Sequence, residues 1–186
     1  IFNPQRRDMD WRRSLGIGDD EPVIGFLGRL VMEKGLDVFS DAIDALRARG
    51  VRHRVLVIGE GPAHDWFASR LQDAVFVGFQ SGADLGRAVA SMDMLFNPSV
   101  TETFGNVTLE TMACAIPVVA ARATGSENLV RDGVTGRLVK PGSISGYADA
   151  LADYCTDVEL RLKHGAAGAE ASSAYDWDRE IGRASC

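Results

Sequence analysis

Cysteine is scarce in this sequence, and the way it is used excludes two kinds of small protein. The three cysteines are odd in number and lie far apart, at Cys114, Cys155 and Cys186. Disulfide-dependent secreted domains carry cysteines in even number, and zinc sites need ligands paired a few residues apart. We therefore expect neither a disulfide framework nor a zinc site, and we expect a protein of the reducing cytoplasm.

Long apolar runs and an excess of positive charge are also lacking. No apolar run approaches the ~20 residues that a membrane-spanning helix needs, and the first residues do not resemble a signal peptide. The formal net charge is −6, whereas nucleic-acid-binding domains carry basic surfaces. We therefore expect no nucleic-acid partner. Four arginines, Arg6, Arg7, Arg12 and Arg13, suggest a solvated face. The alternative is contact with a phosphate or with the inner face of the membrane.

What is present is the profile of a globular α/β domain. The 186 residues are 46% hydrophobic and 25% charged, which is enough for a substantial core. Apolar runs alternate with helical patterns about six times, and this alternation predicts a doubly wound, Rossmann-like parallel sheet with helices on both faces. The expected strands are 23–27, 54–58, 74–77, 94–96, 116–120 and 135–139. We place a lead-in at 1–20 and the domain at 21–186. Because the chain starts at Ile1 rather than methionine, we expect it to be a piece of a longer protein.

The stretch 97–113 organises the rest of the chain. The apolar run 94–96 leads into it, the chain breaks at Pro98, and a helix begins near Gly105 or Asn106. The N-terminus of a helix offers unpaired backbone N–H groups and the positive end of a dipole. We therefore expect an anion site at this helix tip.

Two carboxylates lie in the same stretch, Glu102 in the loop and Glu110 on the helix. Glu110 stands among Leu109, Met112 and Ala113, and a buried carboxylate needs partners. A ribose diol supplies two hydroxyl donors to one carboxylate. One interpretation therefore puts phosphate at the helix tip, ribose at Glu110 and another polar group at Glu102. The alternative is that either glutamate is simply solvated or salt-bridged.

The loop 28–35 brings two cations, Arg29 and Lys34, between a predicted strand and a helix over about 36–49. Ligands of open α/β sheets bind at the carboxyl ends of the strands. An arginine fork and a mobile lysine charge suit a pyrophosphate there. The alternative is two surface cations on a loop. The glycines do not have the G-x-G-x-x-G spacing, so we do not expect a dehydrogenase.

Three segments in order resemble one enzyme family. Residues 101–110 resemble the glutamate-x7-glutamate motif of family 4 retaining glycosyltransferases of the GT-B fold. Residues 28–35 resemble the phosphate-clamping loop of that family, and 124–136 resemble its later donor-side loop. The resemblance covers roughly residues 21–160 and implies the C-terminal, donor-binding half of a GT-B fold. Nothing in the chain resembles the N-terminal, acceptor-binding half.

The resemblance implies sugar transfer from a nucleoside diphosphate sugar, with retention of anomeric configuration. Arg29, Lys34 and the helix tip would stabilise the departing diphosphate. Glu102 would contact the transferring sugar, and we do not assign it as a nucleophile. No metal or other cofactor is expected, because the cations take its place. The acceptor, a glycan, lipid or small molecule, would bind to the missing domain, so this chain alone should bind donor and transfer nothing.

The resemblance also implies a set of donor contacts on several loops. They are Gly28, Val77, Phe79, Phe104, Gly105, Asn106, Glu110, Gly125 and Ser126. Val77 and Phe79 would lie at the base, although a core phenylalanine is an equal alternative. We expect a short helix over 127–131 with Ser126 as its cap, and a closing helix over 175–181.

Other functions remain open. A nucleotide-sugar epimerase shares the fold but needs acid and base groups from the missing half. A non-catalytic nucleotide-binding module is a further alternative, which the two glutamates and two cations disfavour. The segments 8–10 and 176–178 match an acid-x-acid metal pattern of a different glycosyltransferase fold. So short a pattern arises often by chance, and we do not expect metal there.

Overall fold

The computed structural model describes residues 1–102 and 105–175, and it contains one parallel sheet. The strands are β1 (Val23–Leu27), β2 (Arg54–Ile58), β3 (Val75–Gly78), β4 (Met94–Asn97), β5 (Val118–Ala121) and β6 (Gly136–Val139). They pair in the order β3-β2-β1-β4-β5-β6, and every pairing is parallel. The predicted doubly wound sheet is therefore confirmed, with strand ends within two residues of expectation.

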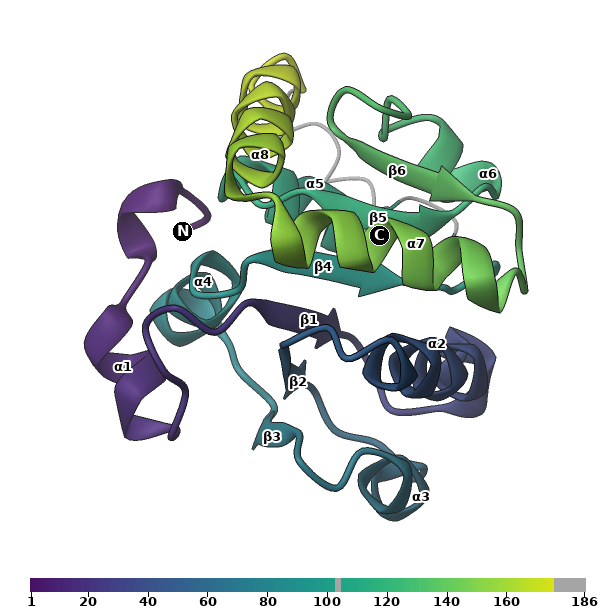
Figure 1. Cartoon of the computed structure of the whole chain (residues 1–186). Coiled ribbons are helices and arrows are strands. Elements are labelled where there is room, and N and C mark those ends of the chain that lie inside the picture. Colours follow the sequence, from purple (N-terminus) through teal and green to yellow (C-terminus); the bar gives the residue numbers. More distant parts are fainter. Residues whose placement is uncertain (103–104, 176–186) are drawn as a thin grey trace.

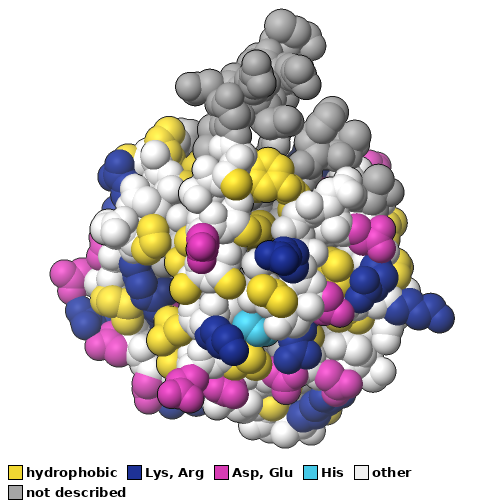
Figure 2. Space-filling view, turned by 90° about the horizontal axis from the view of Figure 1, so that it is seen from above, with side chains coloured by type: hydrophobic (Ala, Val, Ile, Leu, Met, Phe, Trp, Pro, Cys, Tyr) yellow, Lys and Arg dark blue, Asp and Glu magenta, His cyan; other side chains and the backbone are white. Residues whose placement is uncertain are grey.

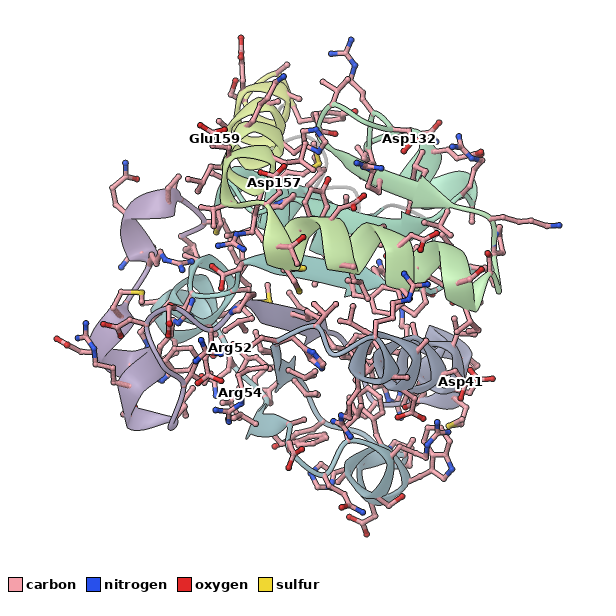
Figure 3. All side chains as sticks on the ribbon, in the orientation of Figure 1. Asp41, Arg52, Arg54, Asp132, Asp157 and Glu159 are labelled. Atoms are coloured by element: carbon pink, nitrogen blue, oxygen red, sulfur yellow. The ribbon has the colours of Figure 1, made fainter. Side chains whose placement is uncertain are left out.

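Helices cover both faces of this sheet (Figure 1). They are α1 (Met9–Ser14), α2 (Leu36–Ala48), α3 (His64–Arg70), α4 (Gly82–Ala90), α5 (Asn106–Ala113), α6 (Thr124–Glu127), α7 (Ile144–Thr156) and α8 (Val158–Ser172). Short 3-10 turns lie at Pro4–Arg6 and Met32–Lys34. Asp157 caps α8 by accepting a hydrogen bond from the Leu160 amide at 3.0 Å (Figure 3).

Aromatic side chains fill the core between β1, β4 and the helices α2, α3 and α7. Phe39 of α2 stacks on Phe96 of β4, with ring centroids 4.8 Å apart, and it meets Phe26 of β1 edge-on at 5.7 Å. Phe67 of α3 and Tyr147 of α7 complete the group. Each such pair contributes about 0.5–1.5 kcal/mol beyond simple burial. The cluster fixes β1 and β4, the two strands whose following loops carry the candidate residues.

The lead-in is bound to the sheet by a buried carboxylate. Asp93, just before β4, accepts hydrogen bonds from Arg7 at 2.7 Å, Arg12 at 3.0 Å and the Val23 amide at 2.8 Å. The Arg12 side chain is only 1% exposed. The expected solvated face is therefore wrong for Arg12, because a buried carboxylate needs such partners. Arg7 stays partly exposed, with 34% of its side chain accessible, while its guanidinium pairs with Asp93. Arg13 does lie on the surface, paired with Asp19.

The structure describes only one of the two acid-x-acid segments, 8–10. Asp8 accepts a hydrogen bond from the Trp11 amide at 2.9 Å and caps α1, which is a structural role. The segment 176–178 lies outside the described residues, as does nearly all of the closing helix expected over 175–181.

The helices and the surface charges are relevant to the alternative that the chain contacts a membrane. None of the helices over residues 1–102 and 105–175 has the length and apolar character of a membrane span. Figure 2 shows Lys and Arg side chains interspersed with Asp, Glu and hydrophobic side chains over the face that it presents.

Candidate functional site

The order of the strands defines where a ligand can enter. From β1 the chain runs outward to β2 and β3, whereas from β4 it runs the other way to β5 and β6 (Figure 1). The loops that leave β1 and β4 therefore diverge at the carboxyl edge of the sheet, and such a switch point forms a crevice. The loops 28–35 and 98–105, predicted as site segments, follow these two strands.

Gly35 brings these two loops into contact. It adopts a left-handed conformation, with φ 75°, at the start of α2. A Cβ at this position would lie 3.2 Å from Cγ and 3.3 Å from the carbonyl oxygen of Pro98. Glycine therefore allows both the turn and the close approach. The neighbouring Lys34 is consequently held beside the loop that follows β4.

Lys34, Glu102 and Glu110 form a cluster of charges, which we call the Lys34 cluster. The Lys34 Nζ atom lies 3.4 Å from Glu102 Oε1, and the two side chains are 31% and 13% exposed. Burial raises the pKa of the half-buried Glu110 to about 7, and repulsion from Glu102 adds to the effect. The structure thus brings together the lysine and both glutamates that the sequence singled out, and Glu110 changes its charge near neutral pH.

The tip of α5 lies at the same edge. The helix begins at Asn106, as predicted, and its N-cap is Gly105 with φ 66°. Glycine has no side chain to satisfy the first amides, and the first turn holds no acidic residue. The positive end of the helix dipole therefore faces a region where an anion can bind.

The loop after β5 packs against the loop after β4. A Cβ at Gly125 would lie 2.5 Å from the carbonyl oxygen of Glu102, so only glycine fits without displacement. The helix expected over 127–131 is wrong, because α6 spans Thr124–Glu127 with Ala123 as its N-cap. Ser126 is buried within that turn and does not cap it. Phe104, also predicted as a donor contact, lies outside the described residues.

An apolar cavity of about 570 Å³ opens at the carboxyl ends of β1 and β2. Gly28, Arg29 and Phe79 line it, and Phe79 is 69% exposed. The alternative that Phe79 is a core residue is therefore wrong. Val77 packs with the core cluster on the α4 face, and its carbonyl accepts a hydrogen bond from Gln80 at 2.8 Å. Arg29 thus lines this cavity, whereas Lys34 of the same loop pairs with Glu102.

Sequence reasoning missed the contribution of the loop after β2. A Cβ at Gly59 would lie 1.9 Å from the carbonyl oxygen of Gly28, and one at Gly61 would lie 2.4 Å from that of Leu30. The Leu30 amide also donates to the Glu60 carbonyl at 2.9 Å. Glu60 and Gly61 therefore join the cavity wall. The signal in the sequence is a pair of glycines, Gly59 and Gly61, directly after a buried strand.

Among the described residues, no group of three His, Cys, Asp or Glu side chains is arranged to hold a metal ion. The chemical groups at the carboxyl edge are therefore a lysine, an arginine, two carboxyl groups and a helix tip, beside an apolar cavity. This combination suits a ligand with a phosphate part, hydroxyl groups and a flat apolar part.

Comparison in sequence supplies an assignment. The family described as "Glycosyl transferases group 1" matches residues 21–157. Sulfoquinovosyl transferase SQD2 of Arabidopsis thaliana is 35% identical over 182 residues, which are 95% of this chain and 35% of that protein. The chain spans less than half the length of the relatives that it matches in sequence.

Comparison in structure agrees. Anabaena Alr3699/HepE in complex with UDP-glucose matches with a TM-score of 0.80 and 26% identity, over 98% of this chain and 55% of that one. The C-terminal domain of a glycosyl transferase group 1 family protein (LpcC) from Francisella tularensis matches with a TM-score of 0.76 and 25% identity. That match covers 93% of this chain and 97% of the domain. This chain therefore belongs to the glycosyl transferases group 1 family, and it has the Rossmann-like fold of the C-terminal half of GT-B enzymes.

Proposed function

We propose that this chain is the donor-binding half of a retaining glycosyltransferase that uses a nucleoside diphosphate sugar. The observation that carries the proposal is the convergence of the Lys34 cluster with the tip of α5 at the switch point of the sheet. Alr3699/HepE has been solved with UDP-glucose, which supports a donor of this class. Retention rests on the likeness of residues 101–110 to the family motif.

The diphosphate is the part of the donor that gains negative charge. When the bond between the anomeric carbon and the phosphate oxygen breaks, its electron pair leaves with the nucleoside diphosphate. Lys34, Arg29 and the N–H groups at Asn106 stabilise that charge. A preorganised donor of this kind contributes about 3 kcal/mol to lowering the barrier. The proposed chemistry needs no metal, since these groups supply the positive charge.

The remaining parts of the donor fit the rest of the edge. The base enters the apolar cavity beside Phe79 and Gly28, and its ribose diol donates hydrogen bonds to Glu110. Glu102, which is only 13% exposed and pairs with Lys34, contacts the transferring sugar. The acceptor then binds in a further domain, which closes over this edge. The isolated chain consequently binds donor without transferring sugar.

Calorimetric titration of the chain with UDP, GDP and ADP, and with their glucose and mannose conjugates, tests the proposal. We expect one nucleotide to be preferred, with a dissociation constant between millimolar and tens of micromolar, or about 4–6 kcal/mol. Lys34→Ala should weaken that binding at least tenfold. Lys163→Ala, an exposed lysine on α8, is the matched control and should leave it unchanged. Equal affinity in parent and Lys34→Ala would refute the phosphate role, and no binding by the parent would refute the donor site.

A further inference from the structure

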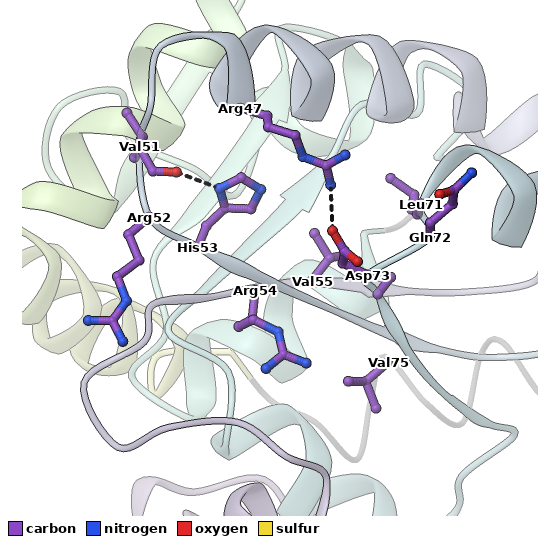
Figure 4. A pocket seen from close by; sticks show the side chains of 11 residues that line it. Arg47, Val51, Arg52, His53, Arg54, Val55, Leu71, Gln72, Asp73 and Val75 are labelled. Carbon is purple, nitrogen blue, oxygen red and sulfur yellow. Dashed lines mark hydrogen bonds and ion pairs between the residues drawn. The ribbon is translucent and has the colours of Figure 1, made fainter.

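A second cavity lies at the amino ends of β2 and β3, on the edge of the sheet opposite to the proposed donor site. Its volume is about 560 Å³, which is the size of a small-molecule site. The charged and titratable residues that line it are Arg47, Arg52, His53, Arg54 and Asp73 (Figure 4). We call this cavity the arginine pocket. Its lining residues lie within 47–55 and 71–75, and none of them belongs to the loops 28–35 or 98–105.

Arg47 and Arg54 use few of their N–H donors in contacts with the described residues. Arg47 Nη2 lies 3.7 Å from the carboxylate of Asp73, which is too long for a hydrogen bond. Arg54 donates through Nη1 to the Gly16 carbonyl at 2.7 Å and lies 3.5 Å from Glu21. A guanidinium carries five N–H donors, so the contacts among residues 1–102 and 105–175 leave most of them for a ligand. Figure 4 shows Arg47 and His53 on one side of β2 and Arg54 on the other.

The other charged residues at the rim of the pocket, Arg52 and Asp73, form only solvent-exposed ion pairs. Arg52 pairs with Asp20 at 3.1 Å in a solvent-exposed contact, and in Figure 4 it points away from His53. The Asp73 side chain is 84% exposed. Exposed ion pairs of this kind are worth about 0–1 kcal/mol, so an anion can displace the Asp73 carboxylate from Arg47 at little cost.

His53 responds to what occupies the pocket. Its Nδ1 atom lies 2.8 Å from the Val51 carbonyl, so Nδ1 carries the proton and Nε2 is the titrating nitrogen. The pKa of His53 lies below its ordinary value, because burial is the largest effect and disfavours the charged ring. Arg47 lowers the pKa further, whereas the Val51 carbonyl and Asp73 raise it in part. The ring is therefore neutral at pH 7. An anion beside it would favour the imidazolium form, which then gives the ligand a further donor at Nε2.

The pocket also has an apolar wall. Val51 and Val75 line it and are partly exposed, whereas Val55 and Leu71 are almost fully buried. A free inorganic ion would leave this wall unused. An organic anion would cover it.

We propose that the arginine pocket binds a small phosphomonoester, with its phosphoryl group held by Arg47 and His53 and its organic part against Val51. The pocket is a binding site separate from the donor edge. A molecule bound there contacts α2, which begins at the loop carrying Lys34.

The test is NMR titration of the His53 imidazole as a function of pH, in inorganic phosphate and in sodium chloride of equal ionic strength. In the parent we expect phosphate to raise the pKa of His53 by at least half a unit, whereas chloride should not. Arg47→Ala should abolish the phosphate effect. Arg49→Ala, which removes a neighbouring arginine paired with Asp149 outside the pocket, should keep it.

Two further variants keep the proposal falsifiable. Asp73→Asn should tighten phosphate binding severalfold, because it removes the carboxylate that competes for Arg47. Lys34→Ala should leave the His53 response intact, which separates this site from the donor site. No phosphate-specific shift in the parent, or an undiminished shift in Arg47→Ala, would overturn the assignment.

Discussion

At the scale of single residues, Glu110 is a half-buried carboxyl group with a like charge nearby. Its raised pKa, about 7, means that the folded chain keeps a proton that the unfolded chain releases above its ordinary value of 4.5. The folded state therefore binds more protons between these two values. Stability must fall as pH rises through this window.

We expect Glu110→Gln to remove the loss of stability at high pH, because glutamine stays neutral at every pH. The variant should exceed the parent in free energy of unfolding by about 1–3 kcal/mol at pH 8, and the two should be equal near pH 4. Urea denaturation at both pH values measures the difference. Glu159→Gln, on the exposed surface of α8 (Figure 3), is the control and should follow the parent. Identical pH profiles for Glu110→Gln and the parent would contradict the assigned pKa.

Glu102 acts on Lys34 at the same scale. In the free domain the 3.4 Å pair holds the lysine that is proposed to bind phosphate. Glu102→Gln should therefore bind a nucleoside diphosphate several times more tightly, since it frees Lys34 and removes a negative charge. Calorimetry with UDP, GDP and ADP measures the change. Weaker binding of every nucleotide would show that Glu102 itself contacts the nucleotide.

Individual residues were predictable from the sequence where their chemistry conflicted with their neighbours. Glu110 stood out as a carboxylate on an apolar helix, and Lys34 and Arg29 stood out on a loop after a buried strand. Asp93 could not be identified in this way. Its partners Arg7 and Arg12 come from the lead-in, and only the fold brings them together.

At the scale of elements, the start of α5 depends on Gly105. This residue has φ 66°, and a Cβ there would lie 2.5 Å from Cδ1 of Leu129. Strand positions were predictable because each apolar run is bounded by turn residues. The bounds of α6 were not, because the Ser126 hydroxyl looked like a cap while tertiary packing buries it.

Gly105→Ala should destabilise the chain by about 1–3 kcal/mol, from left-handed backbone strain and the contact with Leu129. Gly142→Ala, whose φ of 78° is similar but whose Cβ meets nothing within 4 Å, isolates the backbone part. Thermal unfolding of both variants gives the difference. A smaller loss in Gly105→Ala than in Gly142→Ala would mean that Leu129 moves aside freely.

At the scale of the whole molecule, the lead-in and the sheet form one unit through Asp93. The sequence predicted the fold class, and it placed the candidate residues at one edge of the sheet, because both follow from the alternation of strands and helices. It did not predict the packing of the lead-in or the cavity walls after β2. Those depend on long-range contacts such as Arg12 with Asp93 and Gly59 with Gly28.

Asp93→Asn should cost about 3–5 kcal/mol, because it leaves the buried Arg12 without its counter-charge. Denaturant unfolding measures this loss. Asp20→Asn, which breaks only the exposed pair with Arg52, should change stability by less than about 1 kcal/mol. Equal effects of the two substitutions would argue against Asp93 as the anchor of the lead-in.

The most direct measurement of the donor site is amide NMR mapping of the chain during titration with the nucleotide that binds best. The account predicts that the amides of Lys34, Gly105, Asn106 and Glu110 shift together, with a common dissociation constant, while that of His53 stays in place. Shifts confined to other parts of the chain, or a binding nucleotide that leaves the tip of α5 unperturbed, would contradict it.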